Sequence, residues 1–372
     1  MEFRQSSLEG LDVNGGFWSQ KRVLITGHTG FKGSWVSLWL QSLGAEVIGF
    51  SQPAPTQPSL FELAEVASGM ESIRGDVRDF EHLRKVLRES LPVIVIHMAA
   101  QALVRRSYLD PIGTYATNVM GTAHLLEAVR QTETVRAVVV VTSDKCYENT
   151  EQFRPYRETD PMGGFDPYSS SKGCAELITA AFRNSFFHRC EGGAKVAIAS
   201  CRSGNVIGGG DWAEDRLMPD LMRSALEGRQ ATIRNPHAIR PWQHVLEPLS
   251  GYLLLAQKLY EDGARYSHGW NFGPEEEDAK PVSWIVERLA KLWDGGLAWT
   301  VETGSNPHEA QCLKLDCSEA KAKLGWRPQW DLVKSLEATV AWYKAYQSGQ
   351  SIRQLTLEQI HSRHAMCLPA GS

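Results

Sequence analysis

Two kinds of hydrophobic segment alternate along the first half of the chain, from Lys21 onward. Short runs of β-branched and other apolar residues predict buried strands at residues 23–25, 47–50, 93–96, 138–141 and 196–199. Longer amphipathic segments between them predict helices at residues 31–43, 79–90, 113–130 and 168–189. This alternation is typical of βαβ units, so we expect an α/β fold built on a doubly wound parallel sheet.

The pattern changes after the glycine run at residues 208–210. Regular alternation weakens there, Trp and Arg become frequent, and helices are predicted at residues 217–228, 246–261, 282–293 and 331–347. We therefore divide the chain into a sheet domain at 21–208 and a smaller, mostly helical and partly interleaved domain at 209–348. Residues 1–20 are expected to form a polar N-terminal extension, and 349–372 a tail without regular structure.

Composition and charge exclude several classes of protein. The 372 residues are 42% hydrophobic and 22% charged, as in an ordinary soluble enzyme, and the net charge of −4 provides no broad basic face for nucleic acid. No apolar run approaches the roughly 18 residues of a membrane span, and residues 1–20 lack a signal-peptide core. The seven cysteines show neither disulfide-frame nor metal-site spacing, which predicts a cytoplasmic protein without a bound metal.

A glycine cluster follows the first predicted strand and opens the first helix. Gly27, Gly30 and Gly33 form a GxxGxxG pattern, which allows a tight turn, close approach of the backbone to a pyrophosphate, and close packing of helix on strand. In this strand-turn-helix context the pattern favours a dinucleotide site of the Rossmann type over a purely structural turn. Three residues between the glycines are further candidates to bind the cofactor: Thr29, Phe31 and Lys32.

The acidic residue that often binds the adenosine ribose is missing from the end of the second strand. That strand ends Phe50-Ser51-Gln52-Pro53, without an acid for the ribose and without a basic residue for a 2′-phosphate. The absence of a basic residue favours NAD over NADP. Asp76 and Val77, after the third strand, are candidates for the adenine edge, with a helix N-cap region as the equal alternative for Asp76.

A tyrosine and a lysine lie one helical turn apart in the fourth helix. Tyr168 and Lys172 are at i and i+4, where the cationic amine and a nicotinamide ring would stabilise a phenolate and lower the tyrosine pKa. A surface pair on a helix is the alternative interpretation. However, the preceding strand ends in Ser143, and the carboxyl ends of parallel strands are where sites form, so this motif and the glycine turn are expected to converge.

Together these motifs resemble the extended short-chain dehydrogenase/reductase family over roughly residues 20 to 345. The resemblance rests on the glycine turn, Tyr168 with Lys172, and five further segments: His97-Met98-Ala99-Ala100-Gln101, Asn118-Val119-x-Gly121-Thr122, Arg202-x-x-Asn205-Val206-x-Gly208, Asn271-Phe272-Gly273-Pro274 and Leu324-Gly325-Trp326-x-Pro328. It implies NAD as cofactor, with Ala99, Ala100, Gln101 and Asn118 near it. It also implies a homodimer or homotetramer that joins through the helices at 113–130 and 168–189.

Within that family, the end of the fourth predicted strand resembles nucleotide-sugar 4,6-dehydratases. Ser143-Asp144-Lys145, together with residues 55–62 and 240–245, is similar to the members that use CDP-glucose. The implied reaction, within deoxysugar synthesis for a surface polysaccharide, oxidises C4, eliminates water across C5 and C6, and returns hydride to C6. Tyr168, helped by Ser143 and Lys172, would take the 4-hydroxyl proton.

Elimination needs one acid and one base, and Asp144 and Lys145 are unlike groups side by side. We assign Asp144 to protonating the departing 6-hydroxyl and Lys145, partly neutral, to removing the C5 proton. The alternative is an ordinary polar strand exit with a surface ion pair.

The substrate's pyrophosphate calls for arginine forks and neutral donors. The resemblance favours Asn205 and Arg240, and a nucleotide-contacting loop at His308. Arg202, Arg216 and Arg234 are further candidates for which a structural ion pair is an equal alternative.

Two other functions remain open from the sequence. Another nucleotide-sugar enzyme, either a dehydratase of GDP-mannose or dTDP-glucose or a 4-epimerase, shares Tyr168 and Lys172, although an epimerase has no need of the Asp144 and Lys145 pair. A non-catalytic NAD(H)-sensing regulator would typically dispense with Tyr168 and Lys172, which are both present.

Overall fold

A seven-stranded sheet forms the centre of the computed structural model, which describes residues 15–150, 154–187, 196–294, 296–302 and 313–365. The strand order is β11-β6-β5-β4-β1-β2-β3, and each neighbouring pair is parallel. The strands are β1 (Arg22–Thr26), β2 (Glu46–Ser51), β3 (Glu71–Arg74), β4 (Ile94–His97), β5 (Ala137–Val141), β6 (Ala197–Arg202) and β11 (Gly269–Asn271). The order reverses between β1 and β4, which confirms the predicted Rossmann-type doubly wound sheet.

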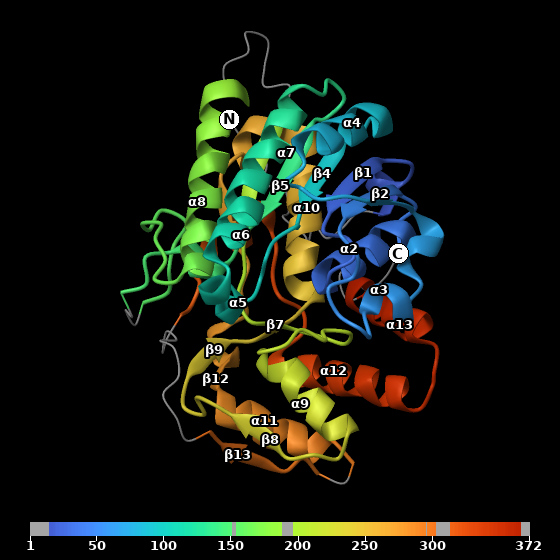
Figure 1. Cartoon of the computed structure of the whole chain (residues 1–372), viewed down its shortest axis with the longest axis vertical. Coiled ribbons are helices and arrows are strands. Elements are labelled where there is room, and N and C mark those ends of the chain that lie inside the picture. The colour runs from blue at the N-terminus through green and yellow to red at the C-terminus, as the bar shows by residue number, and fades with distance from the viewer. Residues whose placement is uncertain (1–14, 151–153, 188–195, 295, 303–312, 366–372) are drawn as a thin grey trace, which may run out of the picture.

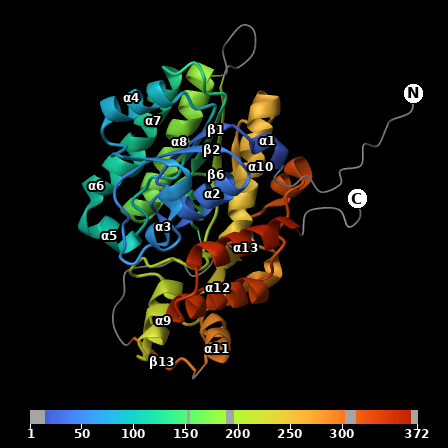
Figure 2. The same ribbon diagram turned by 90° about the vertical axis from the view of Figure 1, so that its right-hand side faces the viewer.

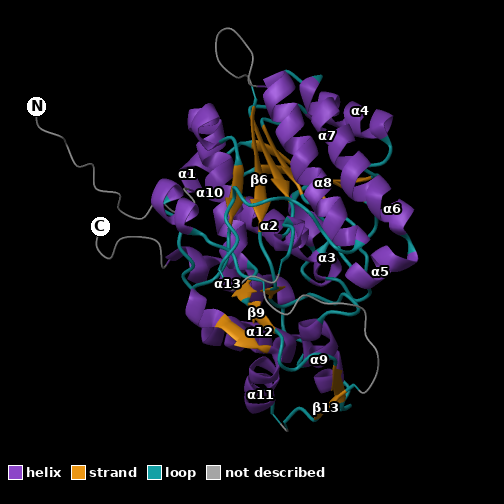
Figure 3. Ribbon diagram, turned by 90° about the vertical axis from the view of Figure 1, so that its left-hand side faces the viewer, coloured by secondary structure: helices purple, strands orange, loops and turns teal. Residues whose placement is uncertain are grey.

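Helices cover both faces of this sheet because successive strand residues point to opposite sides. Ile25 lies in the apolar core that includes residues of α2 (Phe31–Ser42) and α10 (Leu246–Asp262), whereas Leu24 lies in the core with α4 (Phe80–Ser90) and α7 (Gly121–Arg130). Helix α8 (Pro167–Phe182) packs beside α7 on that second face (Figure 1, Figure 3). The five predicted strands and four predicted helices of this region are confirmed.

Short elements connect these layers. They are α1 (Gly15–Trp18), α3 (Leu60–Leu63), η1 (Val66–Gly69), α5 (Val104–Leu109), α6 (Pro111–Tyr115), η2 (Ala116–Met120), η3 (Asp144–Cys146), η4 (Arg183–Phe187), η5 (Gly263–Tyr266), η6 (Glu276–Asp278) and η7 (Ala320–Leu324). Elements α6, η2 and α7 follow one another directly over the segment predicted as one helix. Among the described helices, none combines the length and the apolar character needed to span a bilayer.

A smaller lobe lies below the sheet in Figure 1. Its strands pair two by two: β7 (Val206–Ile207) with β10 (Gln243–His244), β8 (Ala231–Ile233) with β13 (Trp299–Val301), and β9 (Ile239–Pro241) with β12 (Ala279–Pro281). Its helices are α9 (Leu217–Leu226), α11 (Val282–Leu292) and α12 (Leu332–Gln347), close to the predicted ranges. The chain returns from this lobe to the sheet layer through α10 and β11, so the interleaving involves the residues from 246 to 271.

The expectation of a tail without regular structure after residue 349 is wrong for the described part. Helix α13 (Ile352–Ala365) packs against α2 and α12 (Figure 2). Its Arg363 is only 1% exposed, and its Nε donates to Glu247 Oε1 and Oε2 at 3.1 and 3.2 Å. A buried ion pair to α10 therefore fixes this helix on the body of the protein.

Candidate functional site

The turn between β1 and α2 has the shape that a pyrophosphate needs. Gly27 has a φ of +79°, and a Cβ there would lie 2.7 Å from the Ala99 backbone nitrogen. A Cβ at Gly33 would lie 2.1 Å from the Gly27 carbonyl oxygen, so only glycine allows this packing. Gly30 caps α2 without a side-chain hydrogen bond, and the N–H groups of a helix start attract anions. The residues thus fit a dinucleotide cofactor.

The residues at the ends of β2 and β3 are tied to this turn. Thr29 Oγ1 lies 2.8 Å from Ser51 Oγ and donates to the Gln52 carbonyl at 2.9 Å. Gln52 Nε2 donates to Asp76 Oδ2 at 2.6 Å, and hydrogen bonds from Arg78 hold the Asp76 pKa below its ordinary value. Asp76 is therefore an ionised acceptor at this edge, beside the residues that a ribose or adenine would meet.

Two neighbouring observations qualify the predictions around Asp76. The N-cap of α4 is Asp79, which accepts from the His82 N–H, and Asp76 lies three residues before it and accepts from the Arg78 N–H, so the adenine edge and the N-cap region both stay open as interpretations of Asp76. The Val77 side chain is buried against Gly121, where a Cβ would lie 2.7 Å from Val77 Cγ2. Val77 thus packs in the core beneath the edge.

Asn118 connects the loop after β4 to α8. Its Oδ1 accepts from the Gln101 N–H at 2.8 Å, while its Nδ2 donates to the Gln101 carbonyl at 2.9 Å and to Ser171 Oγ at 2.8 Å. Asn118 is buried, whereas Ala99 and Ala100 are partly exposed at the strand end. The amide therefore fixes the predicted cofactor loop relative to the helix that carries Tyr168 and Lys172.

The acid and base predicted for the elimination lie in η3, directly after β5. Ser143 Oγ donates to Asp144 Oδ1 at 2.9 Å and accepts from the Lys145 N–H at 3.2 Å. Asp144 is 3% exposed and rests on Gly204, where a Cβ would lie 1.8 Å from its Oδ2. Gly204 therefore leaves the space in which the carboxyl group lies, and Lys145 is half-buried beside it.

Tyr168 and Lys172 are both buried on α8, whose start is fixed by Asp166 accepting from the Ser169 N–H. Lys172 Nζ donates to the Val141 carbonyl at 3.3 Å, and burial lowers its pKa to about 8. Burial raises the pKa of Tyr168 to about 12, although a hydrogen bond with Ser143 and the charge of Arg216 act in the opposite direction. In the chain without a cofactor, desolvation thus outweighs the nearby charges, and the expected lowering of the tyrosine pKa, which includes the charge of a nicotinamide ring, stays a prediction.

Among the arginines predicted to hold the substrate pyrophosphate, Arg202 has another role. It is 5% exposed, pairs with Glu176 Oε2 at 2.7 Å, and donates to the Tyr147 hydroxyl at 2.8 Å. Glu176 also accepts hydrogen bonds from Thr142 and Ser200. Arg202 is therefore part of a buried polar network behind the catalytic strand end, and the ion-pair alternative describes it.

Arg216, Arg234 and Arg240 lie in the second lobe, more open to solvent than Arg202. Arg216 Nη1 lies 3.2 Å from Asp211 Oδ2, and its charge reaches Tyr168. Arg234 donates to the Asp215 carbonyl at 3.1 Å, and Arg240 on β9 donates to the Ile239 carbonyl at 3.1 Å.

Asn205 has a φ of +38° in the connection from β6 to β7, two residues from Ser203, at the carboxyl edge of the sheet. His308 lies outside the described residues. Arg216 and Asn205 are therefore the candidates that the structure brings nearest to the catalytic residues.

Two residues that the sequence did not single out, Ser203 and Tyr252, form hydrogen bonds at the end of β6 beside the predicted site. Ser203 Oγ accepts from Lys32 Nζ at 3.0 Å and lies 2.6 Å from the hydroxyl oxygen of Tyr252 on α10. The amine of Lys32 reaches the end of β6, and its predicted contact with the cofactor stays a prediction. Nothing in the local sequence marks Ser203 or Tyr252, because their partners are brought together only by the sheet order.

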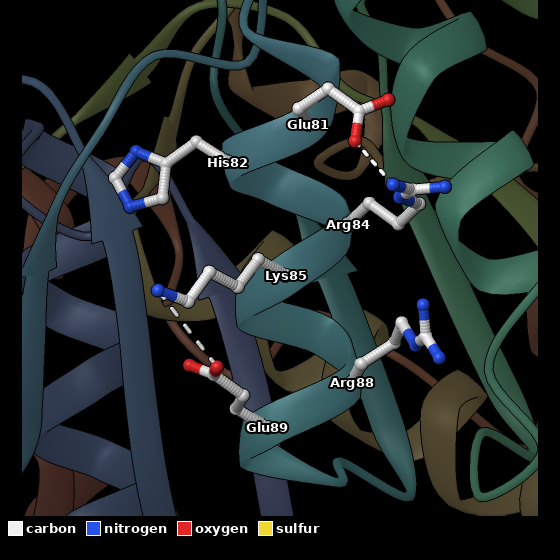
Figure 4. Close-up of a pocket in the computed structure, with 6 residues that line it drawn as sticks. All are labelled: Glu81, His82, Arg84, Lys85, Arg88 and Glu89. Atoms are coloured by element: carbon white, nitrogen blue, oxygen red, sulfur yellow. Dashed lines mark hydrogen bonds and ion pairs between the residues drawn. The ribbon is translucent and has the colours of Figure 1, made fainter.

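The surface pocket in Figure 4 is not this site. Its lining residues all belong to α4 and include the ion pairs of Glu81 with Arg84 and of Lys85 with Glu89. It contains none of the predicted catalytic residues.

Comparison with known proteins agrees with this geometry. Residues 24–339 match the family model described as GDP-mannose 4,6 dehydratase. The chain is 57% identical over 341 residues to the CDP-glucose 4,6-dehydratase of Salmonella typhimurium, covering 91% of this chain and 95% of that protein. It is 29% identical to a dTDP-glucose 4,6-dehydratase of Mycolicibacterium smegmatis, covering 88% and 94%.

Solved structures share the fold. A UDP-glucose 4-epimerase of Thermus thermophilus in complex with NAD superposes with a TM-score of 0.75 at 25% identity, covering 87% of this chain and 99% of that one. A dTDP-glucose 4,6-dehydratase of Bacillus anthracis in complex with NAD gives 0.71 at 23% identity, covering 90% and 99%. The chain therefore belongs to the GDP-mannose 4,6-dehydratase family of nucleotide-sugar enzymes within the short-chain dehydrogenase/reductases.

Proposed function

We propose that this enzyme is an NAD-dependent hydro-lyase that converts CDP-glucose to CDP-4-keto-6-deoxyglucose. The observation that carries the proposal is the 57% identity to a CDP-glucose 4,6-dehydratase over nearly the whole of both chains. The geometry supports it, because an elimination needs an acid and a base in one site, and Asp144 and Lys145 lie together directly after β5. A 4-epimerase would not need that pair.

The cofactor side of the site is formed by the glycine turn and the ends of the neighbouring strands. The turn at Gly27, Gly30 and Gly33 would hold the pyrophosphate of NAD, and Asp76 would lie at the adenosine edge. NAD, when bound, accepts hydride from C4 of the sugar and returns it to C6. The division into a cofactor domain at 21–208 and a substrate domain at 209–348 remains part of this proposal.

The side chains carry the proton transfers. Tyr168, supported by Ser143, takes the proton from the sugar 4-hydroxyl. The resulting ketone acidifies the C5 proton, which Lys145 removes while Asp144 gives a proton to the departing 6-hydroxyl. Asp144 is held for this by the hydrogen bond from Ser143 and by the space above Gly204.

The function is tested by incubating the purified protein and NAD with a panel of nucleotide hexoses and following the products by NMR. We expect the 4-keto-6-deoxy product from CDP-glucose and little from dTDP-glucose or GDP-mannose. Turnover of dTDP-glucose alone would refute the assignment of the base, and a 4-epimer as product would refute the assignment of the reaction. NAD binding without any turnover would favour a regulator.

We also propose that two copies of the chain join through the face formed by α6, η2 and α8. Several large apolar side chains are exposed on and near these helices: Leu109 at 87%, Ile112 at 77%, Met120 at 50%, Phe165 at 80%, Leu177 at 60% and Phe186 at 49%. Exposed patches of this kind mark association surfaces. Sedimentation should give a dimer or tetramer, and Leu177→Glu should dissociate it; a monomeric parent protein would refute the proposal.

The compartment that we propose is the cytoplasm. Cys146, Cys174, Cys201 and Cys317 carry free thiols, as expected in reducing surroundings.

A further inference from the structure

The backbone of Lys32 lies in the glycine turn, whereas its amine lies at the end of β6, against Ser203. Lys32 is the second residue of α2, and Nζ donates to Ser203 Oγ at 3.0 Å. Ser203 follows β6, and its hydroxyl also lies 2.6 Å from the hydroxyl oxygen of Tyr252, which is fully buried. The amine is therefore held at the end of β6, which lies two places from β4 and three places from β1, the strand that the glycine turn follows.

The same short segment that holds the Lys32 amine also supports Asp144. The Asp144 N–H donates to the Ser203 carbonyl at 3.3 Å, and the Asp144 carboxyl group packs on the adjacent Gly204. Ser203 thus contacts both the Lys32 amine and Asp144, and Gly204 contacts Asp144. One residue, Ser203, therefore joins the lysine amine to the group that we assign to protonate the leaving hydroxyl.

Burial and four ionisable groups act on the pKa of Lys32. Burial and the charges of Arg216 and Lys172 lower its pKa to about 7, whereas the charges of Asp144 and Cys201 act to raise it. Asp144 is the carboxylate whose charge acts most strongly to raise the pKa of this amine. Lys32 is therefore protonated most readily when Asp144 is ionised.

We infer that Lys32 is a positioning residue that acts through Asp144, stabilising the carboxylate that Asp144 becomes as it protonates the departing 6-hydroxyl. This inference rests on the proposed 4,6-dehydratase function. In that step the Asp144 O–H bond breaks, a new bond from the proton to O6 forms, and the C6–O6 bond breaks to release water. The electron pair of the C5–H bond becomes the C5–C6 double bond as Lys145 takes the proton. Negative charge develops on Asp144, and the positive charge of the protonated Lys32 amine, held on Ser203, stabilises that charge in the transition state.

The test separates the elimination from C4 oxidation and from NAD binding. In single-turnover experiments with CDP-glucose, Lys32→Met should leave C4 oxidation within about twofold of the parent and slow water loss by roughly 10- to 100-fold, a part of the 10²–10⁴ that general acid catalysis supplies. The reduced cofactor and the 4-keto hexose should therefore accumulate. The NAD dissociation constant should remain unchanged, since the amine reaches Ser203.

The elimination rate with a second substrate distinguishes a role of Lys32 in proton transfer from a purely structural role. With CDP-6-deoxy-6-fluoroglucose the leaving fluoride needs less help from an acid, so Lys32→Met should eliminate it at nearly the parent rate. Lys32→Arg should restore water loss, and should hold the rate at pH values above 7, where the parent declines as the amine loses its proton. Lys85→Met on α4, an exposed lysine, is the matched control.

Three results would overturn the inference while leaving the dehydratase function intact. The first is that Lys32→Met raises the NAD dissociation constant and regains both steps at saturating NAD. The second is that it slows C4 oxidation and water elimination of CDP-glucose equally. The third is that it slows fluoride elimination from the fluoro substrate as much as it slows water elimination. If Lys32→Met does not fold, Ser203→Ala gives the same comparison, because it removes the acceptor that holds the amine. Absence of turnover in the parent protein would instead refute the proposed function, and with it this inference.

Discussion

Removing the charge of Glu247 should destabilise the protein far more than removing a surface carboxylate. Glu247 is 0% and Arg363 is 1% exposed, with N–O distances of 3.1 and 3.2 Å, and the carboxylate also accepts from the Gln329 and Trp330 N–H groups. Breaking a buried pair by neutralising one member leaves the other charge without compensation, at a cost of about 3–5 kcal/mol. We therefore expect Glu247→Gln to lower the free energy of unfolding by about that amount.

Equilibrium unfolding in urea measures this free energy, with Glu89→Gln as the control. Glu89 pairs with Lys85 on the surface, with both side chains about two thirds exposed, and such pairs contribute less than about 1 kcal/mol. The double variant Glu247→Gln with Arg363→Met should be more stable than Glu247→Gln alone, because the buried cation is removed as well. A loss no larger than that of Glu89→Gln, or a double variant no better than the single one, would refute the reasoning.

Three further predictions concern the site and its surroundings. Lys145→Met should permit C4 oxidation of CDP-glucose but block water loss, detected as reduced cofactor without the 6-deoxy product; normal product would refute the role of Lys145. Gly33→Ala should weaken NAD binding by at least tenfold and lower thermal stability, since its Cβ would meet the Gly27 carbonyl at 2.1 Å; unchanged titration and melting curves would contradict the packing. Burial lowers the pKa of His244 to about 3, so the folded protein binds fewer protons than the unfolded chain and loses stability as the pH falls from about 6.5 toward 3. His244→Phe should make acid unfolding less steep, and an unchanged profile would count against this.

The parts of the fold that the sequence predicted are those with a local signal. Uninterrupted β-branched runs identified strands such as β4 and β5, and the strand-turn-helix context identified the glycine turn. The catalytic motifs after β5 and on α8 were found because parallel strands bring their carboxyl ends to one edge of the sheet. Their assigned roles stay predictions until the variants are measured.

Helix α13 was missed because its buried face is not apolar. Thr356, Gln359 and Arg363 are buried there together with Ile352 and Ile360, so hydrophobic periodicity gives a weak signal. The polar members are compensated by partners far away in the sequence. Arg363, for example, pairs with a residue 116 positions earlier.

Contacts between residues far apart in the sequence also determine the environments of Arg202 and Lys32. Arg202 was a candidate for the substrate because an arginine near Asn205 fits a pyrophosphate, but Glu176 on the neighbouring helix neutralises it in the core. Lys32 is a cofactor candidate because it lies in the glycine turn, and its amine donates to Ser203, 171 residues later, a contact that the sequence did not predict. Sequence spacing carries no information about either partner.

The most direct test of the proposed dehydration follows a single hydrogen atom. CDP-glucose labelled with deuterium at C4 should give CDP-4-keto-6-deoxyglucose that carries the deuterium at C6, as observed by NMR and mass spectrometry. That result is expected because the hydride removed from C4 is the one returned to C6 in the same site. Deuterium retained at C4 in an epimer, deuterium lost to solvent, or no conversion of CDP-glucose would contradict the account.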